Sequence, residues 1–339
     1  MATTTTSTLS NQYQEFFSKE LLNHARQAVA LNQFAYKRPL DRKIGAKTIS
    51  FFRFSDAQLN GSGVVADVQS LSEGTPISSF SNGSYTKLSC TLAQYGDAAK
   101  ITDIVTMTEL FNALKDNVQY MGEKAALHAD VITRNVLIAG ITGKRYAQGA
   151  ANFAALAAAS TSAGKARMLD FLDEATQLKI NRAMPFNGYF VAIVPPEVSR
   201  DLQNDPDWIK THQYGSQDEI FKGEIGRWAG CRFVETTVPY KEDGSGSEAT
   251  YAVATLASDR IYRTIITGQQ AYGVPALAGE KVPTMSNETL LSPEIIIVDK
   301  PDKSDPLNQF ITAGWKGYWN ALVLNAAWVR SLSSKTEFA

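Results

Sequence analysis

Between residues 107 and 132 the apolar residues recur every three or four positions, which draws one stripe along the side of a helix. Thr106 and Glu109 have the spacing of a capping box, in which each side chain accepts a hydrogen bond from a free backbone N–H. Gly140 is a suitable stop signal. The pattern predicts a helix of about 33 residues, or roughly 50 Å, far above the usual length. Its stripe consists of Met107, Phe111, Leu114, Val118, Met121, Ala125, His128 and Ile132.

Two strand-like segments precede this helix, separated by a stretch rich in Gly, Ser and Asn. Residues 47–54 read KTISFFRF and residues 84–96 read SYTKLSCTLAQYG, and both are rich in strand-forming residues. We therefore expect residues 45–98 to form a long hairpin with few apolar side chains of its own. Because an isolated hairpin is marginally stable in water, this one requires another surface to lie on. That requirement is the first indication of a partner subunit.

The rest of the chain alternates between helical and strand-like segments. Helices are predicted at 13–31 and 166–182, and a short one follows Pro195, because proline suits a first helical turn. Residues 147–165 are interpreted as an Ala-, Ser- and Gly-rich connector. A buried strand is predicted at 189–194, where the apolar run is short and continuous. Further strands are predicted at 230–237, 251–257, 293–300 and 321–333.

Charge and cysteine content limit the classes of function. The net charge of −1 argues against a dedicated nucleic-acid binder, although not against a protein that encloses nucleic acid without gripping it. Cys90 and Cys231 form neither a zinc spacing nor a disulfide framework, and each is expected to be a small buried apolar residue. Neither a signal peptide nor a membrane-spanning stretch is recognised, so no membrane partner is expected.

Motifs that would indicate an enzyme are incomplete. Residues 61–66 match G-x-G-x-x-A, but no buried strand precedes them and no helix follows. Residues 163–166 lack the Ser or Thr of a phosphate-binding loop. The three histidines, His24, His128 and His212, do not stand at metal-ligand spacing, and His128 is interpreted as a packing residue. No catalytic residue, cofactor site or metal site is predicted.

Several stretches together resemble a known family. Glu73–Pro76, and Gln94–Asp97 leading through Ile101–Asp103 into the long helix, are similar to the passage from arm to spine in a tailed-phage major capsid protein. Residues 218–228, with Gly230 and Phe233–Thr236, resemble the central signature of that family. The matches continue in the same order at residues 268–274, 305–309 and 314–316. Within the family, the sequence resembles most the podophage group whose prototype packages an RNA polymerase in its virion.

The resemblance implies an α+β chain with the tailed-phage major capsid fold, which encapsulins share. The implied divisions are an N-terminal arm (1–44), an extended two-stranded loop (45–98), a peripheral domain with the spine helix (99–165), an axial domain (166–293) and returning peripheral strands (294–339). The implied function is self-assembly into an icosahedral shell of hexamers and pentamers that encloses double-stranded DNA. The shell would be the virion capsid, assembled in the cytoplasm of a bacterial host. Portal, scaffolding and decoration proteins are the further partners that the resemblance implies.

Contacts between subunits are expected at a basic cluster, at the extended loop and in the axial domain. The basic residues between 37 and 53 could form salt bridges with neighbouring subunits or contact DNA. We favour salt bridges with neighbouring subunits. Two other functions remain open: an encapsulin-like compartment that holds proteins, and a soluble α/β enzyme. The predicted contact residues are Lys37, Arg38, Arg42, Lys43, Arg53, Glu73, Trp208, Tyr214, Arg227 and Trp228.

Overall fold

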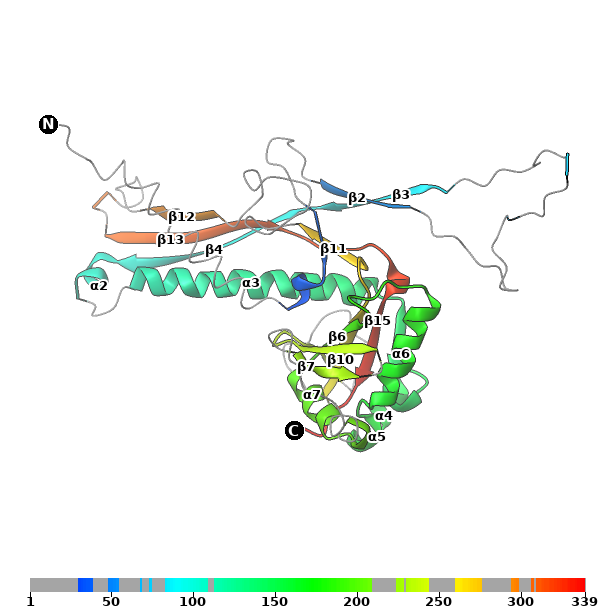
Figure 1. The fold of residues 1–339 in the computed structure, drawn as a ribbon. Coiled ribbons are helices and arrows are strands. Elements are labelled where there is room, and N and C mark those ends of the chain that lie inside the picture. The colour runs from blue at the N-terminus through cyan, green and yellow to red at the C-terminus, as the bar shows by residue number, and fades with distance from the viewer. Residues whose placement is uncertain are drawn as a thin grey trace.

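The chain has an elongated part, in which a long helix lies along a sheet, and a rounded lobe at one end of that helix (Figure 1). This arrangement comes from a computed structural model. The structure describes residues 30–38, 48–54, 68, 73–74, 83–108, 113–208, 224–228, 230–243, 260–275, 294–298, 306–307 and 309–338. The predicted helix at 13–31 and the predicted strand at 251–257 lie almost entirely or entirely outside these residues.

The long helix predicted from the apolar stripe is confirmed as α3 (Ala113–Gly140), which has 28 residues and ends at the predicted glycine. A short helix, α2 (Asp103–Thr108), precedes it. Since α2 begins at Asp103, Thr106 lies inside a helix, and the prediction that it marks the helix start is wrong. The Asp103 carboxylate instead accepts a hydrogen bond from the N–H of Ile104 (2.7 Å), close to the first turn.

An antiparallel sheet in the order β12-β13-β4 lies on α3 and makes up the rest of the elongated part (Figure 1). Ala93–Thr102 pairs with Phe310–Trp319 over ten residues, so the first and last thirds of the chain form one surface. On the side facing the helix, Ala313 and Trp315 pack against Val118 and Met121. The three strands are β4 (Ala93–Thr102), β12 (Glu294–Val298) and β13 (Phe310–Trp319).

The predicted hairpin is confirmed over β2 (Thr48–Phe54) and β3 (Tyr85–Thr91), which pair along seven residues. We call this pair the ribbon. Its predicted boundary at residue 98 is wrong, because β4 starts at Ala93 and pairs with β13 instead. The chain therefore leaves the ribbon at Leu92, whose buried side chain packs with Ile49 and Phe51.

A third, small sheet ties the beginning of the described chain to the spine. Strand β1 (Tyr36–Arg38) runs parallel to β11 (Tyr272–Pro275), and β14 (Leu322–Val323) pairs with β11 from the other side. The 3-10 turn η1 (Leu31–Gln33) comes just before β1 and contacts α3. We call residues 30–38 the arm base.

The lobe is built on a seven-stranded mixed sheet with the order β5-β15-β10-β6-β8-β7, to which β9 adds by pairing with β10. The predicted buried strand is confirmed as β6 (Phe190–Val194), and the strand at 230–237 as β8 (Cys231–Glu235). The other strands are β5 (Gly143–Tyr146), β7 (Glu224–Trp228), β9 (Tyr240–Asp243), β10 (Arg260–Thr267) and β15 (Val329–Ser334).

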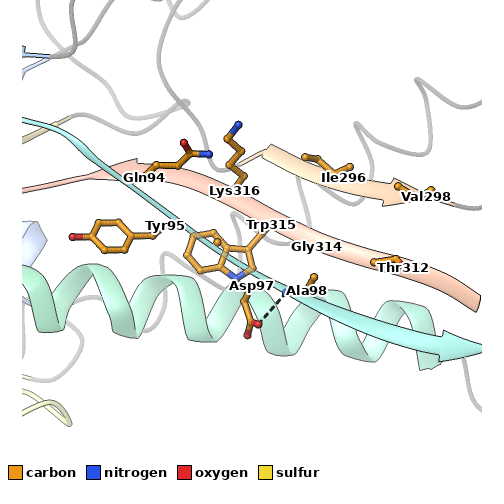
Figure 2. A pocket seen from close by; sticks show the side chains of 11 residues that line it. Gln94, Tyr95, Asp97, Ala98, Ile296, Val298, Thr312, Gly314, Trp315 and Lys316 are labelled. Carbon is orange, nitrogen blue, oxygen red and sulfur yellow. Dashed lines mark hydrogen bonds between the residues drawn. The ribbon is translucent and has the colours of Figure 1, made fainter. Parts of the chain in front are cut away.

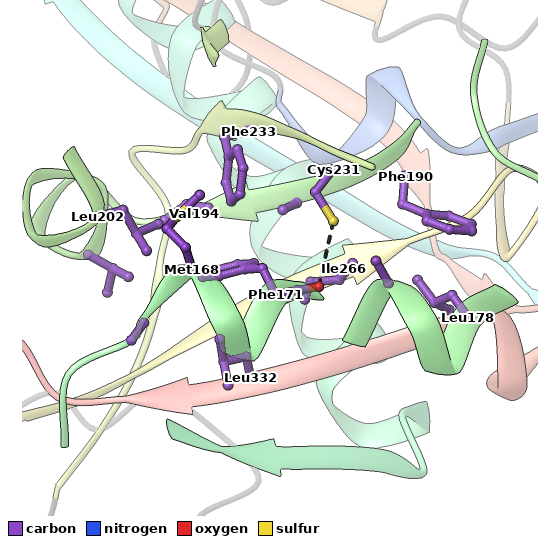
Figure 3. Packing of buried hydrophobic residues seen from close by; sticks show 14 of the residues in the cluster. Met168, Phe171, Leu178, Phe190, Val194, Leu202, Cys231, Phe233, Ile266 and Leu332 are labelled. Atoms are coloured by element: carbon purple, nitrogen blue, oxygen red, sulfur yellow. Dashed lines mark hydrogen bonds between the residues drawn. The ribbon is translucent and has the colours of Figure 1, made fainter. Parts of the chain in front are cut away.

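Helices cover both faces of this sheet. On one face, α6 (Met168–Ile180) and α7 (Pro196–Gln203) enclose the largest core cluster, which includes Phe171, Cys231 and Phe233 (Figure 3). On the other face, the C-terminal end of α3 inserts Leu137 and Ile138 against Val191. The spine helix is thus also part of the lobe's core, which fixes the lobe to the elongated part.

Two features of the lobe differ from the sequence predictions. The connector at 147–165 contains η3 (Ala147–Gly149) and two short helices, α4 (Phe153–Ala158) and α5 (Thr161–Gly164). The strand predicted at 321–333 is divided into β14, the 3-10 turn η5 (Ala326–Trp328) and β15. Because β15 lies between β10 and β5, the last strand of the chain belongs to the lobe and not to the returning peripheral strands.

Candidate assembly surfaces

The ribbon carries exposed aromatic side chains on one of its faces. Phe52, Phe54 and Tyr85 are 59%, 52% and 74% exposed. The rings of Phe54 and Tyr85 meet edge to face at 4.9 Å, and the Arg38 guanidinium lies 5.7 Å from the Phe52 ring centre. We call these three aromatic residues the ribbon face. Exposed aromatic rings gathered on one side of an extended hairpin are typical of a surface that another chain covers.

The opposite side of the ribbon anchors it to the body of the molecule. Ile49 and Phe51 are buried together with Leu92, and Leu322 packs against them. A Cβ atom on Gly273 would lie 2.7 Å from the Phe51 ring, so the ring rests directly on the backbone of β11. Within β2 the buried residues lie in the first half, and the strand is exposed beyond Phe51. Strand β3 adds a further contact, since the Thr91 carbonyl oxygen accepts a hydrogen bond from Asn320 Nδ2 (2.7 Å).

The sheet of the elongated part has a second uncovered apolar face, on the side away from α3. Successive residues of a strand point to opposite faces, so Ile297 packs toward the helix while Ile296 and Val298 point outward. Figure 2 shows these two side chains together with Gln94 and Lys316 along this side of the sheet. We call Ile296, Val298, Phe310 and Tyr318, which are 38–46% exposed, the sheet face.

Glycines shape the groove of about 700 Å³ that runs along the sheet face. A Cβ atom on Gly96 would lie 2.7 Å from the carbonyl oxygen of Trp315, and one on Gly314 would lie 3.2 Å from that of Asp97. Lysines flank the exposed rings: Lys100 Nζ lies 5.3 Å from the centre of the Phe310 ring, and Lys316 Nζ lies 6.0 Å from that of Tyr318. The groove itself is lined by Ile296, Val298 and Lys316, so it offers apolar surface with a positive charge beside it, which suits an aromatic or acidic segment.

Only some of the predicted contact residues lie on an accessible surface. Arg53 on β2 and Glu73 are exposed, and Lys37 and Arg38 on β1 are half-buried. In the lobe, Arg227 and Trp228 are also half-buried, and the Arg227 guanidinium lies 5.6 Å from the centre of the Tyr189 ring. Arg42, Lys43 and Tyr214 lie outside the described residues.

Trp208 was predicted as a contact residue, but its side chain is buried. Its side chain is only 6% exposed and its ring meets that of Phe233 edge to face at 5.4 Å, inside the main core of the lobe. The indole therefore stabilises the subunit itself, and Trp208 does not belong among the contact residues. Trp208 stands in a polar stretch of the sequence, whereas the short helical turn that contains it buries the ring.

The described residues contain little that could perform chemistry. They include no group of three or more His, Cys, Asp or Glu side chains that could hold a metal ion. Both cysteines are free and buried as predicted, and burial raises the pKa of Cys231 to about 12, which keeps the thiol protonated. His128 is exposed, and its ring packs at 4.7 Å against Tyr95 at the edge of the sheet. In the parts of the chain described here, no helix combines the length and apolar character needed to cross a membrane.

Buried charges in the lobe serve its architecture. Arg263 on β10 pairs with Glu242 on β9 at 3.0 Å, and both side chains are at most 2% exposed. Arg330 on β15 forms a second pair with Glu174 on α6, which joins the last strand to the helix. Each pair connects neighbouring elements of the sheet and its helical layer. Neither borders the ribbon face or the sheet face.

The sheet face was missed by the sequence analysis, although a signal was present. In Phe310–Trp319, large side chains stand at both odd and even positions, and Ile296 and Val298 stand in an all-apolar strand. A strand that is apolar on both sides indicates two covered faces. Among the described residues, α3 covers one of these two faces, and Ile296 and Val298 on the other are exposed.

The family of this chain can be assigned from a comparison with family models. Residues 99–291 match the model of a family described as phage capsid protein. The chain belongs to the phage capsid protein family. It is therefore a structural protein of the virion, and its subunits assemble into a shell. A comparison with curated protein sequences found no match.

Solved capsid structures share the fold of this capsid protein at low sequence identity. The capsid of Ralstonia phage GP4 matches with a TM-score of 0.62 and 12% identity, over 86% of this chain and 84% of that one. The capsid of the cyanophage P-SCSP1u matches with a TM-score of 0.60 and 13% identity, over 91% and 89%. A virus-like particle from Pyrococcus furiosus matches with a TM-score of 0.51 and 10% identity, over 94% and 99%. The predicted fold class is confirmed.

Proposed function

We propose that this capsid protein forms hexamers and pentamers of an icosahedral shell that encloses the double-stranded DNA of a tailed phage, and that the ribbon of each subunit lies on the sheet face of its neighbour. The observation that carries this proposal is the pair of unlike apolar faces on one chain. The aromatic rings of the ribbon face are 52–74% exposed. The four side chains of the sheet face are 38–46% exposed and lie along or beside a groove.

Two unlike faces on one subunit produce a head-to-tail contact. Such heterologous contacts close into rings when the rotation between subunits divides a full turn, which is the arrangement in a hexamer or a pentamer. Each subunit both gives a ribbon and receives one, so the two contacts act together and the avidity of the ring exceeds that of a single contact.

The charges of the two faces are compatible with this docking. The ribbon face presents ring surfaces, and the sheet face carries Lys100 beside Phe310 and Lys316 beside Tyr318. Cation–π contacts of this kind contribute about 0.5–1 kcal/mol at exposed sites and more when water is excluded. Burial of the aromatic rings stabilises the contact more strongly, since apolar area contributes about 25 cal/mol per Å².

The near-neutral net charge of −1 supports enclosure of DNA without tight binding. A strongly basic wall would release many counterions on contact with DNA and would hold it firmly. We assign Lys37, Arg38, Arg42, Lys43, Arg53 and Glu73 to contacts near the ribbon, and Tyr214, Arg227 and Trp228 to contacts of the axial domain. Assembly in the host cytoplasm, and portal, scaffolding and decoration proteins as partners, belong to the same proposal.

The proposed subgroup and domain division follow from the same resemblance. The collinear motifs between residues 44 and 330 favour the podophage group whose prototype carries a virion RNA polymerase. We retain the arm, extended loop, peripheral and axial divisions, with the loop ending at Thr91 and with β5 and β15, which share the sheet of the lobe, assigned to the axial domain. An encapsulin-like compartment is the alternative with the same fold.

Electron microscopy of the purified protein tests shell formation. We expect closed shells or ring-shaped capsomers, and a discrete monomer or dimer under all conditions would contradict the proposal. Nuclease-treated particles from phage-producing cells are then opened and their contents identified. Double-stranded DNA is the expected content, whereas a protein cargo would favour the encapsulin-like alternative.

Cross-linking tests the contact between the ribbon face and the sheet face. Phe52→Cys and Ile296→Cys are combined in one chain, where the two native cysteines are buried, and assembled shells are treated with a short bismaleimide. A ladder of covalent oligomers is expected. The matched control combines Phe52→Cys with Leu169→Cys, an exposed position on α6, and should give no ladder. Equal ladders in both variants would refute the docking arrangement.

A further inference from the structure

The Asp130 side chain, in the middle of the spine helix, is completely buried. Its Oδ2 atom accepts hydrogen bonds from the backbone N–H groups of Ala30 (2.8 Å) and Leu31 (3.4 Å), and the N–H of Asn32 also donates to the carboxylate. These three residues are the first residues of the arm base. A single carboxylate thus holds the point at which the N-terminal arm joins the spine.

Neighbouring side chains complete this attachment. The Thr133 hydroxyl contacts Asn32 Oδ1 at 2.9 Å and accepts a hydrogen bond from Trp319 Nε1 at 3.3 Å. The Tyr272 hydroxyl donates to the carbonyl oxygen of Leu31. The arm base is therefore held by side chains from helix α3, strand β13 and strand β11.

The site is incompletely satisfied when Asp130 is ionised. Within the described residues, Asp130 Oδ1 and Asn32 Nδ2 have no hydrogen-bond partner, and both residues are at most 5% exposed. An unpaired carboxylate oxygen in such a place costs free energy unless the group takes up a proton. A protonated carboxyl retains one oxygen as an acceptor for the backbone N–H groups.

The charged and titratable groups around Asp130 offset this cost only in part. Arg134 lies one turn further along α3 and favours the ionised form, but its guanidinium donates to the carbonyl oxygen of Pro239 at 2.8 Å in the lobe. Tyr272 on β11 is neutral, because burial raises its pKa. Among the described residues, η1 and β13 place no charged side chain against the carboxylate. Burial outweighs the hydrogen bonds and Arg134, and it raises the pKa of Asp130 to about 6.

We propose that Asp130 is a proton-operated latch, which holds the arm base on the spine helix when it is protonated and loosens it when it is ionised. Opening of residues 30–32 exposes the carboxylate to water, where it ionises at its ordinary pKa. The open form therefore binds the proton less tightly than the closed form. Linkage then requires that opening becomes easier as the pH rises through the interval between the two pKa values, from about 4 to about 6.

Hydrogen exchange of the full-length protein tests the latch. The opening equilibrium is obtained from the backbone amides of residues 30–32 after correction for the intrinsic pH dependence of exchange. Between pH 5 and pH 7.5 opening should increase about tenfold, as follows from the two pKa values. The amide of Ala192 in the buried strand β6 reports global unfolding and serves as an internal reference.

Two variants separate the latch from other sources of pH dependence. Asp130→Asn keeps an oxygen acceptor but cannot ionise, so the opening of residues 30–32 should no longer change across this interval. Asp116→Asn changes an exposed carboxylate on the same helix and should retain the tenfold increase. No increase in the native protein, or an unchanged increase in Asp130→Asn, would overturn the proposal.

A direct titration keeps the test independent of the variant's folding. In protein labelled with ¹³C at the aspartate side chains, one carboxyl resonance should titrate near pH 6, and Asp116→Asn should retain it. If every aspartate carboxyl of the folded protein titrates below pH 5, the latch does not exist.

Discussion

The lobe and the ribbon are built from similar residue types but depend on different sources of stability. In the lobe, Phe171, Phe233 and Tyr262 are at most 1% exposed and pack within a single chain. In the ribbon, Phe52 and Phe54 are more than half exposed, and among the described residues its buried apolar contacts with the body of the molecule lie at the base of the hairpin. Phenylalanine is thus a core residue in the lobe and an exposed surface residue in the ribbon.

This contrast shows how a shell subunit divides its apolar residues between folding and assembly. The lobe packs its main apolar core within one chain, whereas a two-stranded hairpin by itself is only marginally stable in water. In the arrangement proposed above, the ribbon completes its burial against a neighbouring subunit. Changes in the lobe should therefore act on the stability of the isolated subunit, and changes in the ribbon should act on assembly.

The sharpest test of the contrast is the same substitution in both regions. Phe171→Ala removes a fully buried ring whose centre lies 5.0 Å from that of Phe233, and should lower the free energy of unfolding by about 3–5 kcal/mol. Phe52→Ala should change it by less than about 0.5 kcal/mol. Urea unfolding of the unassembled subunits measures both. Equal losses in the two variants would show that the ribbon is part of the subunit's own core.

The second largest effect is expected at the buried ion pair of the lobe. Arg263→Met removes the cation that faces Glu242 at a site 1% exposed, and should cost about 3 kcal/mol of unfolding free energy. Arg263→Met combined with Glu242→Leu removes both charges and should recover most of that loss. Urea unfolding again measures the effect. If the double variant is no more stable than the single one, charge burial is not the cause.

The local elements of the lobe and spine were largely predictable, because their signals lie in consecutive residues. The stripe through Val118 and Met121 identified α3, and the unbroken apolar run of β6 identified a central strand. The start of the spine was misjudged because Thr106 and Glu109 have the spacing of a cap, although the chain is already helical from Asp103.

Long-range pairing was not predictable in the same way. Strand β4 pairs with β13 across more than two hundred residues, and no local pattern specifies that partner. The short helices α4 and α5 did leave readable signals: the side chain of Asn152 accepts a hydrogen bond from the N–H of Ala155 (2.8 Å), and that of Ser160 from Ala163 (3.3 Å). Both residues are favoured N-caps.

Of the two candidate assembly surfaces, one was predictable from the sequence and the other was not. The ribbon was foreseen because its strands alternate and its connection is rich in small polar residues. The sheet face was not, since which side of β12 and β13 faces water depends on where α3 packs. Trp208 was misassigned because a polar neighbourhood in the sequence does not reveal that Phe233 lies beside its ring.

A smaller effect on stability is expected at the junction of the last strand with the short helices. Lys335 is 2% exposed, and its ammonium donates to the carbonyl oxygens of Ala157 (2.8 Å) and Ala159 (2.7 Å), at the C-terminal end of α4. Lys335→Met should cost about 1–2 kcal/mol of unfolding free energy. Lys165→Met removes a more exposed ion pair with Glu337 and should cost less than about 0.5 kcal/mol. Thermal unfolding of both variants measures the effect. If the two variants lose the same unfolding free energy, the hydrogen bonds from Lys335 to the end of α4 do not stabilise the subunit.

The smallest effect on the subunit, together with a large one on assembly, is expected at the sheet face. Ile296→Ser with Val298→Ser removes two half-exposed apolar side chains that point away from α3, so the unfolding free energy should change by less than about 1 kcal/mol. The neighbour's ribbon would lose the apolar wall of its groove, and shells should fail to close. Ile297→Ser, the residue between them, faces the helix and should instead destabilise the subunit. Urea unfolding and electron microscopy of all three proteins separate the two outcomes, because normal shells from the outward-facing variant would show that the ribbon docks elsewhere.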